Sequence, residues 1–324
     1  MKRWMVRIVF GPLALVALAL VCGATYEALS RNRFASHAAA PGKLVSIGDR
    51  ALYVDCRGTG SPTVVFESGL GSAGALDWSL VHDEVARTTR ACSYSRAGIH
   101  ASDPGVGERD ANAVADDLHT LLERAGERSP IVLVAHSLGG PYAVTYTRKF
   151  GAEVAGLVLV DTLHPDSMKR MEAAGIHMPN LVRPIQIASA LRWTGLPRLL
   201  YPAGEETDYE LRSLAGMRSE LEALEQTLFE ADALHQFGSR PVYVLSSGKN
   251  EDEFLDQTGL TAEQGTRFLA IKRELNEEQA SWSSHSQHEV VTDSAHQIQW
   301  SQPERVVHAA RWVIDAVRAA TPSQ

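Results

Sequence analysis

The sequence predicts an α/β fold in which a mostly parallel β-sheet carries helices on both faces. Short uncharged apolar runs alternate with longer amphipathic stretches along most of the chain, which is typical of such sheets. Hydrophobic residues make up 44% and charged residues 22% of the sequence, which is typical of a globular protein and excludes a disordered or fibrous one. The 324 residues suffice for one large domain or two smaller ones.

The first element is an apolar segment over residues 8–26 that contains no charged residue. As a helix it would be about 28 Å long, close to the thickness of the hydrocarbon core of a bilayer. Three cations precede it, so the positive-inside rule predicts a cytoplasmic N-terminus and an exported remainder. We expect residues 1–28 to anchor the protein in a membrane, and residues 29–42 to form a linker. A cleaved signal peptide, which would leave a secreted protein, is the alternative.

The formal net charge of −8 is unevenly distributed. Residues 1–33 carry a net charge of +4, whereas the remaining residues carry −12. An acidic balance argues against nucleic acid or an anionic membrane surface as the main partner. We therefore expect no nucleic-acid binding, and a membrane contact only through the N-terminal segment.

After the linker, the chain alternates between predicted strands and helices. A hairpin is expected over 43–47 and 51–57. The apolar runs that predict buried strands are residues 63–67, 91–95, 131–135, 156–161, 241–246 and 288–291. The helices expected between and after them are residues 76–88, 110–125, 140–150 and 303–319.

Residues 162–240 interrupt this alternation. They contain helical patterns over 185–193 and 209–233 and no clear strand pattern. We therefore expect a core over 43–161 and 241–324, with a helical cap over 162–240. An apolar pocket beneath such a cap would suit a substrate that is partly apolar.

Ser137 is the candidate nucleophile. It follows a predicted buried strand and precedes a predicted helix, within Ala-His-Ser-Leu-Gly, one residue different from the Gly-x-Ser-x-Gly nucleophile elbow. Small residues must flank a nucleophile on such a strained turn, and Ala135 still meets that need. The N–H groups of the helix that begins at Leu138 point toward developing negative charge. The alternative is a serine that only caps the helix.

Several motifs occur in an order that resembles the α/β-hydrolase family, over residues 43–320. They are Glu67-Ser-Gly-Leu-Gly71, Tyr94-Ser-Arg-Ala-Gly98, His136-Ser-Leu-Gly-Gly140, Leu157-Val-Leu-Val-Asp161 and Ser294-Ala-His296. The nearest branch is a bacterial group with an N-terminal hydrophobic segment. The chain departs from it at Ser95, where the branch has Asp, and has Ala135 and Ala295 where Gly is usual. The resemblance implies an eight-stranded, mostly parallel sheet flanked by helices, with a helical cap.

The resemblance also implies the remaining catalytic groups. His296 stands between a short strand and the closing helix, where the family presents the base that takes the proton of Ser137. The two N–H donors of the oxyanion hole are expected at Leu138, directly after the nucleophile, and at Leu70.

Two carboxylates are candidates for the acid of the triad. Asp161 follows four apolar residues at the end of the sixth strand, so we expect it to be rigid and partly desolvated. Glu251 follows the seventh strand, where most of the family has Asp, but it lies in a charge-rich run typical of solvated loops. We favour Asp161 and keep Glu251 as the alternate acid.

The chain has three cysteines. Cys22 lies in the apolar segment, whereas Cys56 and Cys92 lie in strands that are neighbours in the sheet of the α/β-hydrolase family. An exported domain would allow these two to form a disulfide; two buried thiols are the alternative. No Cys/His cluster has metal-ligand spacing and no Gly-rich phosphate loop occurs, so we expect no metal and no cofactor.

Together these features predict a serine hydrolase that cleaves a small-molecule carboxylic ester, or a related acyl compound, through an acyl-enzyme. The alternative is a catalytically weak, membrane-anchored binding or sensor protein on the same scaffold. The presence of both Ser137 and His296 favours the enzyme.

Overall fold

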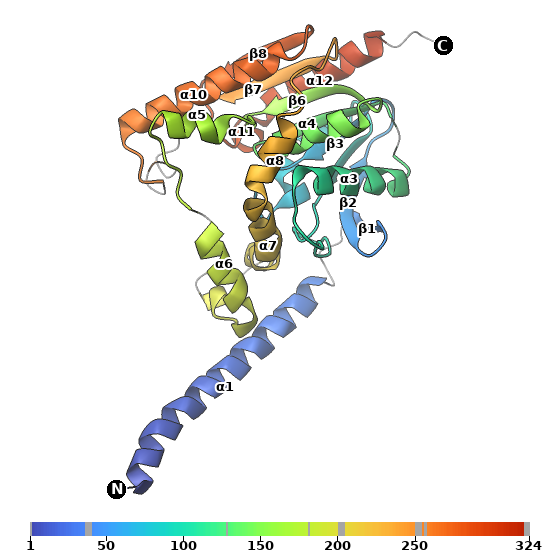
Figure 1. Cartoon of the computed structure of the whole chain (residues 1–324). Coiled ribbons are helices and arrows are strands. Elements are labelled where there is room, and N and C mark those ends of the chain that lie inside the picture. Colours follow the sequence, from blue (N-terminus) through green and yellow to red (C-terminus); the bar gives the residue numbers. More distant parts are fainter. Residues whose placement is uncertain are drawn as a thin grey trace.

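The computed structural model describes residues 2–35, 41–127, 129–180, 182–199, 205–249, 255 and 258–320. Its centre is one eight-stranded sheet with the strand order β1-β2-β4-β3-β5-β6-β7-β8 (Figure 1). β1 pairs antiparallel with β2, and β2 pairs antiparallel with β4, whereas every pair from β4 to β8 is parallel. The strands are β1 (Lys43–Ser46), β2 (Ala51–Arg57), β3 (Thr63–Glu67), β4 (Ala91–Tyr94), β5 (Ile131–His136), β6 (Val154–Val160), β7 (Val242–Ser247) and β8 (Ser286–Val291).

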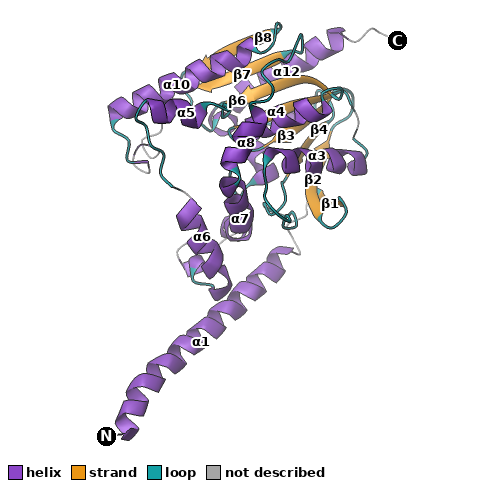
Figure 2. Cartoon of the chain, in the orientation of Figure 1, coloured by secondary structure: helices purple, strands orange, loops and turns teal. Residues whose placement is uncertain are grey.

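Helices cover both faces of the sheet, and a separate apolar core fills each face (Figure 2). On one face the core includes side chains of α3 (Ala111–Ala125) and α4 (Gly139–Phe150). On the other face it includes side chains from α2 (His82–Ala86) and α12 (Pro303–Ala320). Since central strands such as β5 are buried along their whole length, their continuous apolar runs have the physical origin that the sequence pattern indicated. The predicted fold class is confirmed.

The segment predicted to form the cap is helical where the structure describes it. Within residues 162–180, 182–199 and 205–240 it adds no strand to the sheet. Its elements are α5 (Ser167–Ala173), α6 (Val182–Leu191), the 3-10 turns η2 (Arg192–Thr194) and η3 (Pro197–Leu199), α7 (Glu205–Glu222) and α8 (Leu224–Ala231).

A further helix lies between β7 and β8, outside the predicted cap. This helix, α10 (Ala262–Ser281), begins with a capping box formed by Thr261 and Gln264. The sequence analysis did not assign it, because its polar and charged residues are spread around the helix and leave no clear apolar stripe. The last short helix, α11 (Ile298–Ser301), precedes α12.

The N-terminal segment is one long helix, α1 (Lys2–Ala35), which extends away from the rest of the molecule (Figure 1). Among the described residues, its Gly11–Ser30 stretch is the one helix long and apolar enough to cross a membrane, a character shared by membrane anchors and signal sequences. The first seven residues of the predicted linker are helical, because no Gly or Pro occurs there to end the helix.

A disulfide joins Cys56 and Cys92, which lie directly opposite each other on β2 and β4. Cys22 is free and exposed on α1. Glu127 approaches the two sulfurs closely enough to complete a three-residue cluster of potential metal ligands. Because both sulfurs are bonded to each other, this cluster offers no pair of thiolates to a metal ion.

Candidate active site

Ser137 lies on a sharp turn between β5 and α4. Its φ angle is 53°, in the left-handed region that is costly for a residue with a side chain. Neighbouring atoms come so close that a Cβ cannot be accommodated at Gly139 or Gly140, two and three residues after it. A Cβ on Gly139 would lie 2.5 Å from the carbonyl oxygen of Glu67, and one on Gly140 would lie 2.5 Å from Thr162 Cβ. The local geometry is that of a nucleophile elbow.

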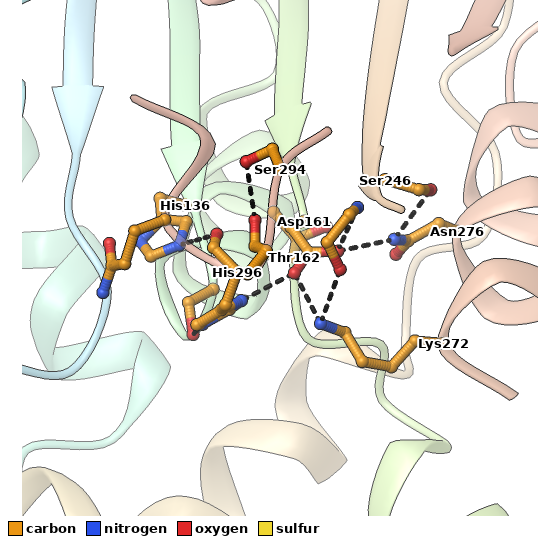
Figure 3. A network of polar contacts seen from close by, with 12 residues as sticks. His136, Asp161, Thr162, Ser246, Lys272, Asn276, Ser294 and His296 are labelled. Carbon is orange, nitrogen blue, oxygen red and sulfur yellow. Dashed lines mark hydrogen bonds and ion pairs between the residues drawn. The ribbon is translucent and has the colours of Figure 1, made fainter. Parts of the chain in front are cut away.

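The structure brings Ser137, His296 and Asp161 together at the carboxyl ends of β5, β8 and β6 (Figure 3 shows the histidine and the aspartate). His296 Nε2 lies 2.9 Å from Ser137 Oγ, and His296 Nδ1 lies 2.6 Å from Asp161 Oδ2. The partners favour the tautomer in which Nδ1–H donates to the carboxylate and Ser137 donates to Nε2. The His296 side chain is 42% exposed, whereas that of Asp161 is 1% exposed.

Asp161 is held as a buried carboxylate. Its Oδ1 accepts a hydrogen bond from the backbone N–H of Ser247 at 2.9 Å, and its Oδ2 also contacts the ammonium of Lys272. Burial alone would raise the pKa of the Asp161 carboxyl, but the charge of Lys272 and the hydrogen bond from His296 outweigh it and hold that pKa well below its usual range. Asp161 therefore stays ionised at neutral pH.

Two polar residues of α10, which the sequence analysis missed, surround this carboxylate. Lys272 and Asn276 lie one helical turn apart, and Asn276 Nδ2 lies 3.5 Å from Asp161 Oδ1 and 3.0 Å from Ser246 Oγ (Figure 3). Their i, i+4 spacing in the sequence was the available signal, because it places both on one helix face. What the sequence could not indicate is that this face covers the ends of β6 and β7.

His136 supports the backbone of His296. Its Nε2 lies 3.1 Å from the carbonyl oxygen of His296, and its Nδ1 lies 3.2 Å from the amide nitrogen of Gln299 (Figure 3 labels both histidines). Burial, followed by the proximity of His296, lowers the pKa of His136 well below its ordinary value. A neutral His136 can then donate from Nε2 to the carbonyl oxygen while Nδ1 accepts from the amide.

The loop after β3, residues 68–71, lies against Ser137. A Cβ on Gly69 would lie 2.9 Å from both Ser137 Cβ and His136 Nδ1, so the absence of a side chain permits this approach. Leu70 on this loop and Leu138 on the turn belong to one apolar cluster together with Tyr142. The two residues predicted to supply oxyanion donors therefore flank Ser137.

Arg96 ties this loop to the cap. Its guanidinium donates to the carbonyl oxygens of Ser68 at 2.6 Å and Gly69 at 2.8 Å, and to Glu67 Oε1 at 2.7 Å. Its other edge makes a bidentate pair with Glu220 of α7, at 2.7 and 2.9 Å. Arg96 and Glu220 are almost completely buried. The sequence analysis quoted Arg96 only as part of a motif and did not identify Glu220.

The alternate acid, Glu251, lies outside the described residues. The described part of the site thus brings together five of the six predicted residues: Ser137, His296, Asp161, Leu70 and Leu138.

Comparison with known proteins agrees with this architecture. A model of the Alpha/beta hydrolase family matches residues 20–309, which confirms the resemblance inferred from the motifs. The structure of a thermophilic esterase from Thermogutta terrifontis superposes with a TM-score of 0.58 at 24% identity, over 86% of this chain and 99% of that one. At that level of identity the superposition supports the fold alone.

Two curated relatives extend the comparison. An AB hydrolase superfamily protein of Gibberella zeae is 24% identical over 79% of this chain and 87% of its own length. A probable transporter, efuK, of Hormonema carpetanum is 35% identical over 40% of this chain, but the match covers only 19% of its length. Two further relatives from Bacillus subtilis are covered over 53% and 41% of theirs. The chain thus spans about half or less of these last three relatives.

Proposed function

The chain belongs to the α/β-hydrolase family, and from this premise we propose that it is a serine hydrolase that cleaves carboxylic esters or related acyl compounds. The observation that carries the proposal is the continuous chain of short contacts from Ser137 Oγ through the ring of His296 to Asp161. A nucleophile, a base and an orienting carboxylate in that order are the parts that acyl transfer needs.

In the proposed reaction, Ser137 Oγ attacks the ester carbonyl while His296 Nε2 takes its proton. The backbone N–H groups of Leu138 and Leu70 stabilise the oxyanion of the tetrahedral intermediate. As the intermediate collapses, the carbon–oxygen bond breaks and His296 gives its proton to the departing alcohol. Water, deprotonated by His296, then attacks the acyl-enzyme and releases the carboxylic acid and free Ser137.

Asp161 is the acid in this proposal. It contacts His296 Nδ1 directly, and its depressed pKa keeps it charged when the imidazolium forms. Asp161→Asn and Glu251→Gln distinguish the two candidates, as set out in the Discussion.

We further propose that α1 is a retained membrane anchor and that the catalytic domain is exported. Glu27 of α1 and Arg198 of η3 form a 2.9 Å ion pair in which both side chains are nearly fully buried, at 2% and 8% exposed. Removal of α1 as a signal peptide would leave Arg198 without this partner, at a cost expected for a broken buried pair. The disulfide between Cys56 and Cys92 supports an oxidising compartment.

A series of p-nitrophenyl esters of increasing acyl length tests the proposed activity. We expect the purified full chain to hydrolyse them and Ser137→Ala to reduce kcat by several orders of magnitude. Hydrolysis that is equal in wild type and Ser137→Ala would refute the proposal. Failure of the wild type to hydrolyse any acyl compound would favour the binding or sensor protein instead.

A further inference from the structure

The cap is docked directly on α1. A Cβ on Gly23 would lie 2.0 Å from the carbonyl oxygen of Thr194, and one on Gly195 would lie 2.6 Å from that of Gly23. The backbones of α1 and η2 are therefore in contact at two glycines. Figure 1 shows α6 beside the C-terminal half of α1, next to this contact.

Charged groups strengthen this docking. Arg198 pairs with Glu27 of α1 and also with Asp208 of α7, so that one guanidinium joins the N-terminal helix to two parts of the cap. Glu27 directly follows the uncharged segment 8–26 and lies within the candidate span Gly11–Ser30. An acidic residue within a membrane span is energetically costly unless it is paired with a cation. The structure supplies the partner from the cap, so the cap reaches the level at which α1 leaves the bilayer.

Apolar side chains of the cap surround this contact and remain exposed. We call them the cap face; they are Ile187, Leu191, Trp193 and Leu196, exposed by 61%, 38%, 58% and 49%. Every residue of α6 remains at least partly exposed. Trp193 and Leu196 of the cap face directly flank Thr194 and Gly195, which contact α1 at Gly23. Leucines and valines of α1 are likewise exposed; they include Leu13, Leu15, Val16, Leu18 and Val21. A tryptophan beside the end of a span is typical of the membrane–water interface.

We propose that the cap face lies in the outer leaflet of the bilayer that α1 crosses, and that the enzyme acts on lipid esters held in that bilayer. The inference rests on the serine-hydrolase function proposed above and specifies its substrate class. The cap face contacts the bilayer itself, because the bilayer is the apolar medium that already surrounds the adjoining surface of α1.

The same elements lead from the cap face to the nucleophile. Gln186 of α6 donates to Glu222 of α7 at 2.8 Å, and two residues earlier Glu220 binds Arg96. Arg96 in turn binds the carbonyl oxygens of the loop after β3, residues 68–71, which we call the oxyanion loop. Leu70, Leu163 and Leu224 pack against the apolar cluster that contains Leu138, so the residue directly after Ser137 lies in apolar surroundings that suit an acyl chain. A cap seated in the leaflet would therefore hold the site next to its lipid substrate.

Electrostatic attraction does not explain the proposed contact between the cap face and the bilayer. The chain beyond residue 33 carries a net charge of −12, which an anionic surface would repel. Burial of the apolar side chains of the cap face in the bilayer must then supply the attraction. We therefore expect the contact to form on uncharged lipid and to be insensitive to salt.

Fluorescence quenching by brominated lipids tests the contact. The full chain is reconstituted in phosphatidylcholine vesicles with brominated acyl chains, and the emission that each Trp→Phe variant removes is compared. We expect the Trp193 component to be quenched at least twofold, at both low and high salt. Trp300, exposed by 51% on α11 of the core, is the matched control and should be unquenched.

An unquenched Trp193 would overturn the proposal. Trp193 emission that depends on the protein-to-lipid ratio instead of bromination would also overturn it, because it would indicate that a second copy of the chain covers the cap face.

An activity assay in the same vesicles tests the substrate class. We expect the double variant Trp193→Ser, Leu196→Ser to hydrolyse a long-chain ester embedded in vesicles at least tenfold more slowly than wild type, with unchanged hydrolysis of a soluble short-chain ester. Phe229→Ser, at a cap residue that is 74% exposed on α8, should leave both rates unchanged. Equal loss on both substrates would contradict the proposal. Lack of hydrolysis of both esters in wild type would refute the hydrolase function, whereas the quenching result would still decide the membrane contact.

Discussion

At the carboxyl edge of the sheet, Ser137, Asp161 and His296 each follow a strand whose backbone is fixed by its neighbours, whereas the cap is attached by buried ion pairs between distant segments. The pairs are Arg96–Glu220 and Arg198–Glu27. Changes at the edge should therefore affect chemistry and leave the fold intact. Changes at the attachments should affect how the cap is held, and only through it the chemistry.

The largest effect is expected at the edge. Asp161→Asn should lower kcat by about 10⁴-fold, because the amide cannot stabilise the imidazolium of His296 or fix its tautomer. Steady-state kinetics on a soluble ester measures this. Glu251→Gln is the paired variant and should stay within about twofold of wild type. The reverse pattern would assign the acid role to Glu251 and show that Asp161 is not the acid of the triad.

The next effect concerns stability alone. Replacing both Cys56 and Cys92 by serine should lower the free energy of unfolding by about 4 kcal/mol, since the disulfide closes a loop of 36 residues. Denaturant unfolding of the detergent-solubilised protein gives the value, with Cys22→Ser as the control that should change nothing. If alkylation without reduction modified all three cysteines, the disulfide would be absent.

A smaller effect should show that the attachment of the cap influences the chemistry at the edge of the sheet. Glu220→Gln removes one of the two buried carboxylates that pair with Arg96 and leaves Glu67, so the guanidinium should be held less firmly against the oxyanion loop. We expect kcat to fall about tenfold with KM nearly unchanged, because the oxyanion forms only in the transition state. Glu225→Gln, at an exposed residue of the neighbouring cap helix α8, is the control. A change in KM alone would mean that Arg96 serves the cap and not the oxyanion loop.

The smallest effect is a pH dependence. The pKa of Asp161 is depressed in the folded protein relative to about 3.9 in an unfolded chain. Its charge therefore stabilises the fold above about pH 5, and that stabilisation is lost as the pH falls toward the folded pKa. Lys272→Met should raise the folded pKa, and each unit of increase should shrink the acid-side loss of stability by about 1.4 kcal/mol.

Unfolding in detergent at about pH 7 and about pH 1, where the loss approaches completion, measures this difference. Lys169→Met, at an 84% exposed lysine, should leave the pH dependence unchanged. An identical slope in Lys272→Met and wild type would show that Lys272 does not hold the Asp161 charge.

The sequence was sufficient to select the residues that the structure brings together at the carboxyl edge of the sheet, because each of them is specified by its immediate neighbours. The apolar run before Ser137 predicts a strand, the glycines after it permit the tight turn, and Asp161 follows an equally apolar run. Sheet pairing then brings the strand ends together. Local patterns are sufficient for such a site.

The ion pairs of the site and of the cap escaped prediction because the two residues of each pair are far apart in the chain. Lys272 is 111 residues from Asp161, Glu220 is 124 residues from Arg96, and Arg198 is 171 residues from Glu27. No local pattern specifies which polar side chains meet after the helices pack. The end of α1 was missed for a different reason: a helix without a stop signal continues as long as its neighbours allow.

Covalent labelling with a fluorophosphonate tests the central claim most directly, because it requires a serine activated by its histidine in the folded protein. We predict that the intact chain is labelled on the peptide containing Ser137, that Ser137→Ala is not labelled, and that His296→Ala is labelled far more slowly. Folded wild-type protein that resists the probe, or Ser137→Ala that reacts as fast as wild type, would contradict the account.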